Sequence, residues 1–176
     1  MDSTKGVISS ENRAFLFGDG IFESIRVISG RPCFLDNHFN RLKMGLEVLS
    51  IIPKDPEVFD RIEKDIMKVI QENGLKEGGR VRLTVSRSSA GFYRPTDDNG
   101  LDYHIAASTL PENGFALNEK GLTVDIYTDF RKQINRMAYF KTLNCQLYVM
   151  ASVYAKQQGL DNVLLTNEND CIGGDQ

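Results

Sequence analysis

The sequence predicts an α+β fold in which helices pack on a sheet and a second domain follows. Strand-like alternation of apolar residues over 21–28 and 80–87 predicts two strands. Apolar residues at helical spacing over 39–49 and 59–70 predict two amphipathic helices between those strands. The stretch 111–120 contains Pro, Gly, two Asn and charged residues, and it is therefore the best candidate for a linker between domains.

The first predicted strand, over 21–28, is rich in β-branched and aromatic residues. A Ser-Gly pair follows as a turn signal, and 32–35 is predicted to return as a short strand. Asp36 or Asn37 is suited to cap the next helix, because a short polar side chain can accept a hydrogen bond from the first turn. The apolar stripe of this helix consists of Phe39, Leu42, Leu46 and Leu49.

The second predicted helix opens at 55–57, where Asp is the cap and Pro stands in the first turn. It ends at the Asn-Gly pair 73–74. The strand over 80–87 follows, then a polar loop over 88–100 and a strand over 103–107. The buried face of the helix is predicted to consist of Phe59, Ile62, Ile66, Val69 and Ile70.

The domain organisation that we expect is an N-terminal domain over 1–110, a linker over 111–120 and part of a second domain over 121–176. Within the second domain the pattern predicts strands over 122–127 and 162–166, a helix over 142–157, and a turn over 167–170. The return strand starts at Cys171 and stops almost at once. Because a one-armed hairpin leaves backbone groups without partners, we expect the chain to be cut short inside a β-structure.

Composition excludes several classes of partner. The chain has 176 residues, 41% of them hydrophobic, and a net charge of -3 with a pI of about 5.4. We therefore expect no nucleic acid and no membrane as partner, and small molecules instead. The three cysteines, Cys33, Cys145 and Cys171, lack metal-ligand spacing, so we expect no metal site. The N-terminus lacks the apolar stretch of a signal peptide, which indicates a cytoplasmic protein.

Lys141 is the most informative residue for chemistry. Apolar residues 137–140 precede it and Leu143 follows, at what we expect to be the head of a helix. Burial lowers the pKa of a lysine and frees its amine to form an imine with an aldehyde. The alternative is a surface lysine in the first turn of a helix.

Arg41 is the second candidate, because a guanidinium offers a planar fork that suits phosphate oxygens. From spacing alone, a solvated arginine beside a core leucine is an equally good interpretation. His38, three residues earlier, is better explained as a capping or packing residue than as a catalyst.

Three segments together resemble the class IV (fold-type IV) aminotransferases, which use pyridoxal phosphate (PLP). They are 15–26 (FLFGDGIFESIR), 38–42 (HFNRL) and 139–144 (YFKTLN). The resemblance covers roughly residues 9 to 172. It implies an N-terminal α/β sandwich domain followed by the start of a barrel-like cofactor-binding domain, and a homodimer. It also implies that Lys141 binds PLP as a Schiff base, that Arg41 grips its phosphate, and that Asn144 is a polar residue on the cofactor side.

The resemblance also suggests a substrate site. Phe17 and Phe22 would form an apolar wall beside the cofactor, although a place in the core is a strong alternative explanation for both. Arg80 and Arg82 lie two apart on a strand and so point to one face, where the resemblance implies a clamp for a substrate carboxylate. A solvated sheet face is the alternative, and Arg87 is a further candidate. The family's D-amino acid branch is disfavoured, because its Arg-x-His carboxylate trap has no clear counterpart around 92–94.

Three hypotheses about function follow. The first is a PLP-dependent aminotransferase that acts between an amino acid and a 2-oxo acid. The second is a lyase of the same family that releases pyruvate from 4-amino-4-deoxychorismate, which the loop over 86–88 favours. The third is a non-catalytic binding domain or incomplete fragment. Gly174 stands where the resemblance implies a glutamate against the pyridine nitrogen, so we expect slow turnover or none from this chain as it stands.

Overall fold

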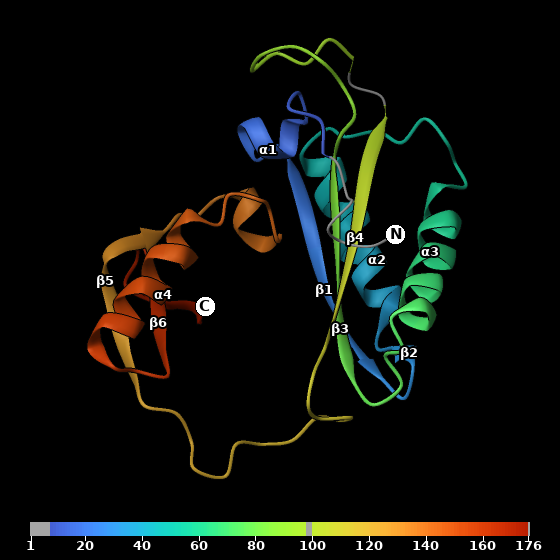
Figure 1. Ribbon diagram of the computed structural model, residues 1–176. Coiled ribbons are helices and arrows are strands. Elements are labelled where there is room, and N and C mark those ends of the chain that lie inside the picture. The colour runs from blue at the N-terminus through green and yellow to red at the C-terminus, as the bar shows by residue number, and fades with distance from the viewer. Residues whose placement is uncertain (1–7, 98–99, 176) are drawn as a thin grey trace. The chain divides into compact units, whose positions relative to one another are not determined.

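The computed structural model describes residues 8–97 and 100–175, which fold into two compact units (Figure 1). The first unit holds the described residues up to Phe115 together with Phe140–Leu143. The second unit holds Ala116–Tyr139 and the chain from Asn144 onward. The predicted linker 111–120 is thus divided between the units, and the sequence analysis did not foresee the return of Phe140–Leu143. Residues 1–7, in which we expected no signal peptide, lie outside the described part.

The sheet of the first unit has the strand order β2-β1-β3-β4, and every neighbouring pair is antiparallel. Its strands are β1 Gly20–Ile28, β2 Arg31–Pro32, β3 Gly79–Arg87 and β4 Leu101–Thr109. Apolar residues alternate with polar ones along β1 and β3, so one face of the sheet is buried. The predicted strands over 21–28, 80–87 and 103–107 are confirmed, whereas the short strand predicted over 32–35 is two residues long and lies earlier.

Helices α2 Leu35–Val48 and α3 Val58–Glu72 cover that buried face (Figure 1). Our prediction of the α2 cap was wrong: the cap position is Phe34, which has a φ of 54° and makes no side-chain capping bond. Asp36 instead stands in the first turn, where its charge favours the helix N-terminus. The Asn-Gly end of α3 is confirmed, since Asn73 is its C-cap.

A short helix, α1 Arg13–Phe17, precedes β1 and was not predicted. The side chain of Asn12 accepts a hydrogen bond from the backbone N–H of Phe15, which explains where α1 begins. Gly18 ends it with a φ of 65°, a left-handed conformation that glycine adopts without strain. This helix brings its residues next to the beginning of β1.

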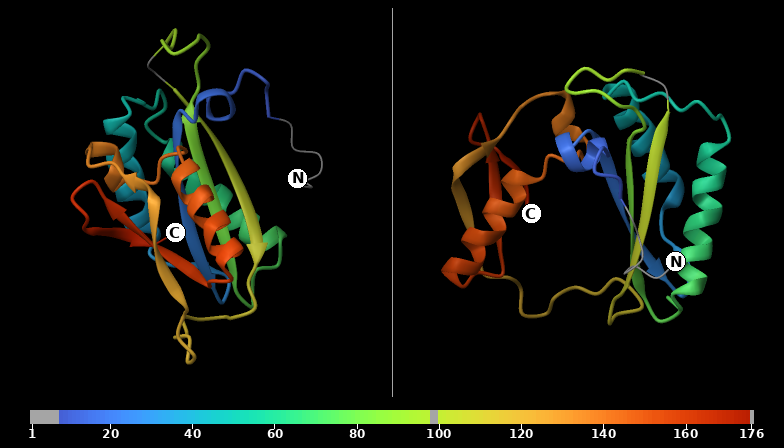
Figure 2. Two further views of the ribbon diagram at one scale, coloured as in Figure 1. Left: turned by 90° about the vertical axis from the view of Figure 1, so that its left-hand side faces the viewer. Right: turned by 45° about the horizontal axis from the view of Figure 1, so that its top comes forward.

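The second unit contains β5 Val124–Lys132, the 3-10 helix η2 Arg136–Tyr139, helix α4 Gln146–Gln158, β6 Asn162–Asn167 and β7 Ile172–Asp175. Strand β5 pairs with β6 in parallel, β6 pairs with β7 antiparallel, and α4 packs against β5 and β6 (Figure 2). The turn over 167–170 and the return strand are confirmed, and the strand extends to Asp175. None of the described helices combines the length and the apolar surface that crossing a bilayer requires.

The helix predicted over 142–157 begins only at Gln146, with Cys145 as its cap position. The expectation that Lys141 stands at the head of a helix was therefore wrong. The chain around Lys141 pairs with a strand instead, and backbone pairing to a distant strand competes with local helix formation.

Candidate active site

Backbone hydrogen bonds pair the segment around Lys141 with the edge of β1. The N–H of Phe22 donates to the carbonyl oxygen of Lys141 over 2.8 Å, and the N–H of Leu143 donates to the carbonyl oxygen of Gly20 over 3.0 Å. Thr142 forms an antiparallel bridge with Ile21 between these two bonds. Because β2 pairs only with the far end of β1, this edge is free to accept the segment Phe140–Leu143.

Two glycines make room for this segment. A Cβ atom on Gly45 would lie 2.2 Å from Cδ1 of Ile21 and 3.2 Å from Cδ1 of Phe140. A Cβ atom on Gly20 would lie 2.4 Å from the carbonyl oxygen of Val85 and 2.9 Å from Cδ1 of Leu143. Helix α2 can therefore approach β1 closely, and Phe140 packs against the core of the first unit.

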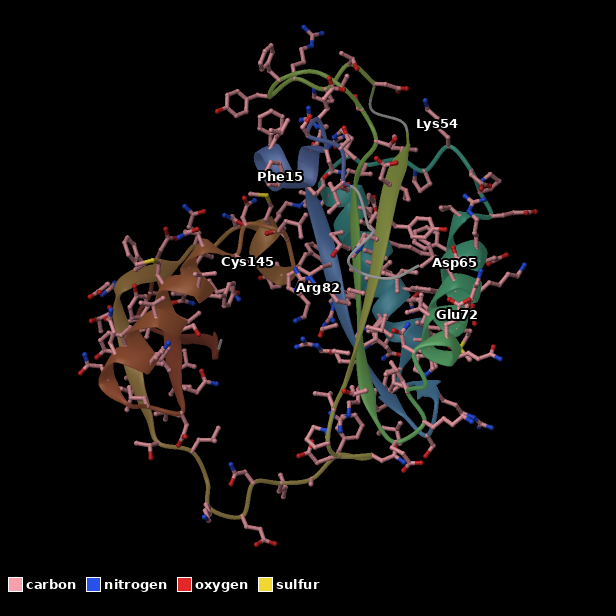
Figure 3. All side chains as sticks on the ribbon, in the orientation of Figure 1. Phe15, Lys54, Asp65, Glu72, Arg82 and Cys145 are labelled. Atoms are coloured by element: carbon pink, nitrogen blue, oxygen red, sulfur yellow. The ribbon has the colours of Figure 1, made fainter. Side chains whose placement is uncertain are left out.

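The ring of Phe22 lies next to two cations. Nζ of Lys141 is 5.2 Å from the centre of the ring, and Cζ of Arg82 is 3.7 Å from it. Figure 3 shows Arg82 on the side of the sheet away from α3, which carries Asp65 and Glu72. Lys141 is exposed within the described chain, so the burial that we expected for it is not confirmed. Its apolar contact is the Phe22 ring.

Arg41 is paired with Glu23, the residue after Phe22 on β1. Nε of Arg41 donates to Oε1 of Glu23 over 2.7 Å, and Nη2 donates to Oε2. Nδ1 of His38 lies 2.7 Å from Oε2 of the same carboxylate. Glu23 is fully buried, whereas 41% of the Arg41 side chain is exposed. The hydrogen bonds that Arg41 donates to Glu23, together with the charge of that carboxylate, raise the pKa of Arg41 above its ordinary value, so Arg41 stays a cation.

Arg87 lies in a different cluster, which centres on Asp19. Nε of Arg87 donates to Oδ2 of Asp19 over 3.0 Å, and its other nitrogens donate to the carbonyl oxygens of Ser50 and Leu49 over 2.7 and 2.6 Å. Nε of Arg13 donates to the same Oδ2 over 2.7 Å. Burial raises the pKa of Asp19, but the hydrogen bonds and charges of Arg87 and Arg13 together lower it below its ordinary value. These contacts support a structural role for Arg87.

Arg80 and Arg82 point to the face of the sheet that α2 and α3 leave open. Arg80 stands directly opposite Arg26 on β1, and Arg82 stands opposite Ser24. Arg80 has no hydrogen-bond or ion-pair partner among the described residues, and like charges opposite each other in a sheet are unfavourable. Arg26, Arg80 and Arg82 therefore place three cations on this face, and the carboxylate clamp remains a hypothesis.

The remaining two predicted residues take no part in these contacts. The Phe17 ring packs 5.5 Å from the ring of Tyr93 and 5.0 Å from Cζ of Arg13, on α1. Asn144 is exposed and belongs to the second unit. The structure thus brings Lys141, Phe22 and Arg82 together. Arg41 lies on α2 and pairs with Glu23, the next residue of β1, whose side chain points to the opposite, buried face of the sheet. Gly174 lies in β7, opposite Leu165.

A surface pocket of about 1100 Å³ lies elsewhere, along α3 and the turn between β1 and β2. Met67, Lys68, Gln71 and Asn113 are among its lining residues, and none of the predicted site residues takes part. Its charged lining is mixed, with Asp60 and Glu63 beside Lys64 and Lys68. The residues around β1 remain the better candidate site, because the residues that the sequence analysis singled out lie there.

Sequence reasoning assigned no role to Glu23 and took His38 for a capping or packing residue. The signal that would have found this pair is the position of Glu23 between Ile21 and Ile25, on the apolar face of an alternating strand. A carboxylate at such a position is buried, and a buried carboxylate has to be paired with a cation or a donor. Arg41 and His38 stand three residues apart on the next helix, where both face one side.

Comparisons with known proteins bear on the family and the fold of the chain. The family model of amino-transferase class IV matches residues 20–172. Aminodeoxychorismate lyase of Bacillus subtilis (strain 168) is 28% identical over 163 residues, which cover 90% of this chain and 52% of that protein. D-alanine aminotransferase of Staphylococcus haemolyticus is 24% identical over 132 residues, which cover 64% of this chain and 45% of that protein. This similarity gives no support to our exclusion of the D-amino acid branch.

Among solved structures, the branched-chain amino acid aminotransferase of Escherichia coli matches with a TM-score of 0.79 at 17% identity. The match covers 96% of this chain and 57% of that structure. It confirms the predicted α+β fold class. The chain spans about half the length of the curated relatives that it matches.

Proposed function

The chain belongs to the class IV aminotransferase family, and from this premise we propose that it carries the lysine and the phosphate-binding arginine of a PLP-dependent aminotransferase. The reaction that we propose transfers an amino group between an amino acid and a 2-oxo acid. One observation carries the proposal: Lys141 and Arg41, far apart in the sequence, are held by consecutive residues of β1, Phe22 and Glu23.

The residues present suit a phosphorylated aromatic aldehyde. Nη1 of Arg41 has no hydrogen-bond partner among the described residues, and the side chain is exposed, so its outer edge is open to phosphate oxygens. The amine of Lys141 is exposed beside the flat ring of Phe22. When bound, PLP supplies an electron sink for the charge that develops at the substrate Cα.

Each side chain has a defined task in this proposal. Nζ of Lys141 holds the cofactor and then takes and returns the proton of the substrate Cα. Arg41 holds the phosphate, and Phe22 limits the access of water to Nζ. Arg82, stacked on Phe22, and Arg80 beside it are proposed to bind a substrate carboxylate. Phe17 and Asn144 stay proposals for the substrate wall and the cofactor side.

A second candidate function is release of pyruvate from 4-amino-4-deoxychorismate. The similarity to the aminodeoxychorismate lyase of Bacillus subtilis favours it, since this match extends over 90% of the chain. Both reactions use Lys141 and Arg41 in the same way. Pyruvate formation and amino transfer to 2-oxoglutarate, measured side by side, separate the two.

Three further properties are proposals that rest on the family. They are a homodimer, a location in the cytoplasm, and slow turnover by this chain as it stands. The last follows from Gly174, because a glycine offers no acidic partner to a pyridine nitrogen. Turnover at rates typical of enzymes, about 1 to 1000 per second, would contradict it.

The first test is covalent trapping of PLP by borohydride, followed by absorbance and intact mass. We expect the wild-type protein to retain one cofactor after reduction and Lys141→Ala to retain none. Lys43→Ala is the matched control, since Lys43 is also exposed and its Nζ lies 4.6 Å from the ring centre of Phe59. Equal trapping in Lys141→Ala and the wild type would overturn the proposal.

A further inference from the structure

Glu23 is a charged residue within the apolar face of the first unit's sheet. It is fully buried between Ile21 and Ile25, which are also fully buried. A carboxylate at such a place lowers stability unless charged or polar groups surround it. Its partners, Arg41 and His38, both come from α2, which packs on this strand. Neutralising the buried carboxylate would not by itself require this particular geometry, because any nearby cation or hydrogen-bond donor could serve.

The arrangement does more than neutralise Glu23. The carboxylate binds Arg41 through two nitrogens, Nε and Nη2, and this two-point contact fixes the plane of the guanidinium. His38 holds Oε2 from another side, so the carboxylate itself cannot turn. Only Nη1 and the outer edge of Nη2 remain free to meet a ligand.

We propose that Glu23 is a positioning residue, which orients Arg41 so that its outer N–H groups face the phosphate of a bound ligand. This inference rests on the proposed function, in which Arg41 binds the PLP phosphate. A long, half-exposed arginine otherwise samples many rotamers, and binding then has to offset the loss of that freedom. A guanidinium already fixed by Glu23 and His38 loses little on binding, which strengthens its grip on the anion.

Arg80 shows that such a pairing is not general in this unit. It is exposed and has no hydrogen-bond or ion-pair partner among the described residues, although it lies on the same sheet. An exposed arginine of this unit can therefore lack a carboxylate partner. The pairing of Arg41 is thus a local feature of the strand that also holds Lys141.

The experiment compares dissociation constants for PLP and for pyridoxal, which lacks the phosphate, by fluorescence titration. The variants are Glu23→Gln, Arg41→Ala and the double variant. We expect the wild type to bind PLP more tightly than pyridoxal, and Glu23→Gln to lower the affinity for PLP about tenfold while leaving that for pyridoxal unchanged. Arg41→Ala removes the preference, and adding Glu23→Gln to it has no further effect.

Asp55→Asn is the control, because it also removes a carboxylate from an arginine, Arg61, at 2.7 Å on the surface. It should leave the preference for PLP intact. Thermal unfolding of each variant shows whether it is folded. Should Glu23→Gln not fold, Glu23→Asp keeps the charge, but its side chain is one methylene shorter and cannot reach both nitrogens from the same backbone position, so the same loss of preference is expected.

Two outcomes overturn the inference. A folded Glu23 variant that keeps the wild-type preference shows that Arg41 needs no positioning. Additive effects in the double variant show that Glu23 does not act through Arg41. The proposed function fails separately, if borohydride traps no cofactor at Lys141. A wild type that binds PLP and pyridoxal equally shows that Arg41 does not bind the phosphate, and the inference about Glu23 then fails as well.

Discussion

Asp19 and Glu23 lie four residues apart, and arginines hold both of them, yet the two clusters differ in what their arginines leave free. Asp19 lies between Arg13 and Arg87, whose side chains are 4% and 8% exposed. The other N–H groups of Arg13 bind the carbonyl oxygens of Gly91 and Phe92. Arg41, the partner of Glu23, is 41% exposed and keeps Nη1 without a partner among the described residues.

This difference separates an arginine that holds the fold from one that can bind a ligand. Arg87 and Arg13 connect backbone segments, and their exposure is too small for an anion to reach them. Arg41 uses one edge for the protein and presents the other edge outward. The sequence shows arginine and carboxylate in both places, so the distinction becomes visible only when each N–H group is followed to its partner.

The largest expected effect comes from Asp19→Asn. The substitution keeps the shape of the side chain but leaves two buried guanidinium groups without their negative charge. We expect the free energy of unfolding to fall by about 3 kcal/mol, measured by urea denaturation. The affinity for PLP relative to pyridoxal should stay unchanged in the folded protein. A loss below about 1 kcal/mol would mean that the carbonyl oxygens alone neutralise these arginines.

The next effect compares two identical substitutions, Arg87→Lys and Arg41→Lys. Arg87→Lys removes the donors to the carbonyl oxygens of Leu49 and Ser50 and should lower the unfolding free energy by about 2 kcal/mol. Arg41→Lys keeps one contact to the buried carboxylate of Glu23 and loses the other, so a smaller loss of about 1 kcal/mol is expected. Urea denaturation of both variants checks the order. Equal losses would remove the distinction between the clusters.

The smallest effect is a dependence on pH. The pKa of Asp19 is lower in the folded protein than its ordinary value of 3.8, so its carboxylate stabilises the fold fully above that value. This contribution is lost as the pH falls through the folded pKa. The stability difference between wild type and Asp19→Asn should therefore be constant near neutral pH and shrink below about pH 3.8, as measured by urea denaturation at stepped pH. A difference that stays constant down to acid unfolding would contradict this assignment.

The sequence predicted those parts of the fold in which one local pattern decides the outcome. Alternation in β1 and β3 and the apolar stripes of α2 and α3 correspond to a buried sheet face with two covering helices. The start of α4 was placed four residues early, because Thr142 has a β-bridge to Ile21 that no local pattern shows. The cap of α2 was missed because Phe34, at a φ of 54°, serves where a polar residue is usual.

The candidate site was predicted less completely than the helices and strands. Lys141, Arg41, Phe22 and Arg82 were named from motifs. The structure brings Lys141 and Arg82 to the ring of Phe22, whereas Arg41 pairs with the neighbouring Glu23. Lys141 is exposed, which was only the alternative to the burial that we expected, since apolar neighbours in sequence need not be neighbours in space. Glu23 was missed because motif comparison directs attention to residues that touch the cofactor rather than to those behind them.

The return of Phe140–Leu143 to the first unit has a consequence during synthesis. A ribosome makes the chain from its N-terminus, so the described part of this unit up to Phe115 emerges before Lys141 does. Arg41 can meet Glu23 during that interval, while the edge of β1 at Gly20–Phe22 still lacks its partner segment. An open strand edge can pair with another chain. When Phe140–Leu143 pairs with this edge of β1, the edge is no longer open to other chains. The same pairing brings Lys141 to Phe22.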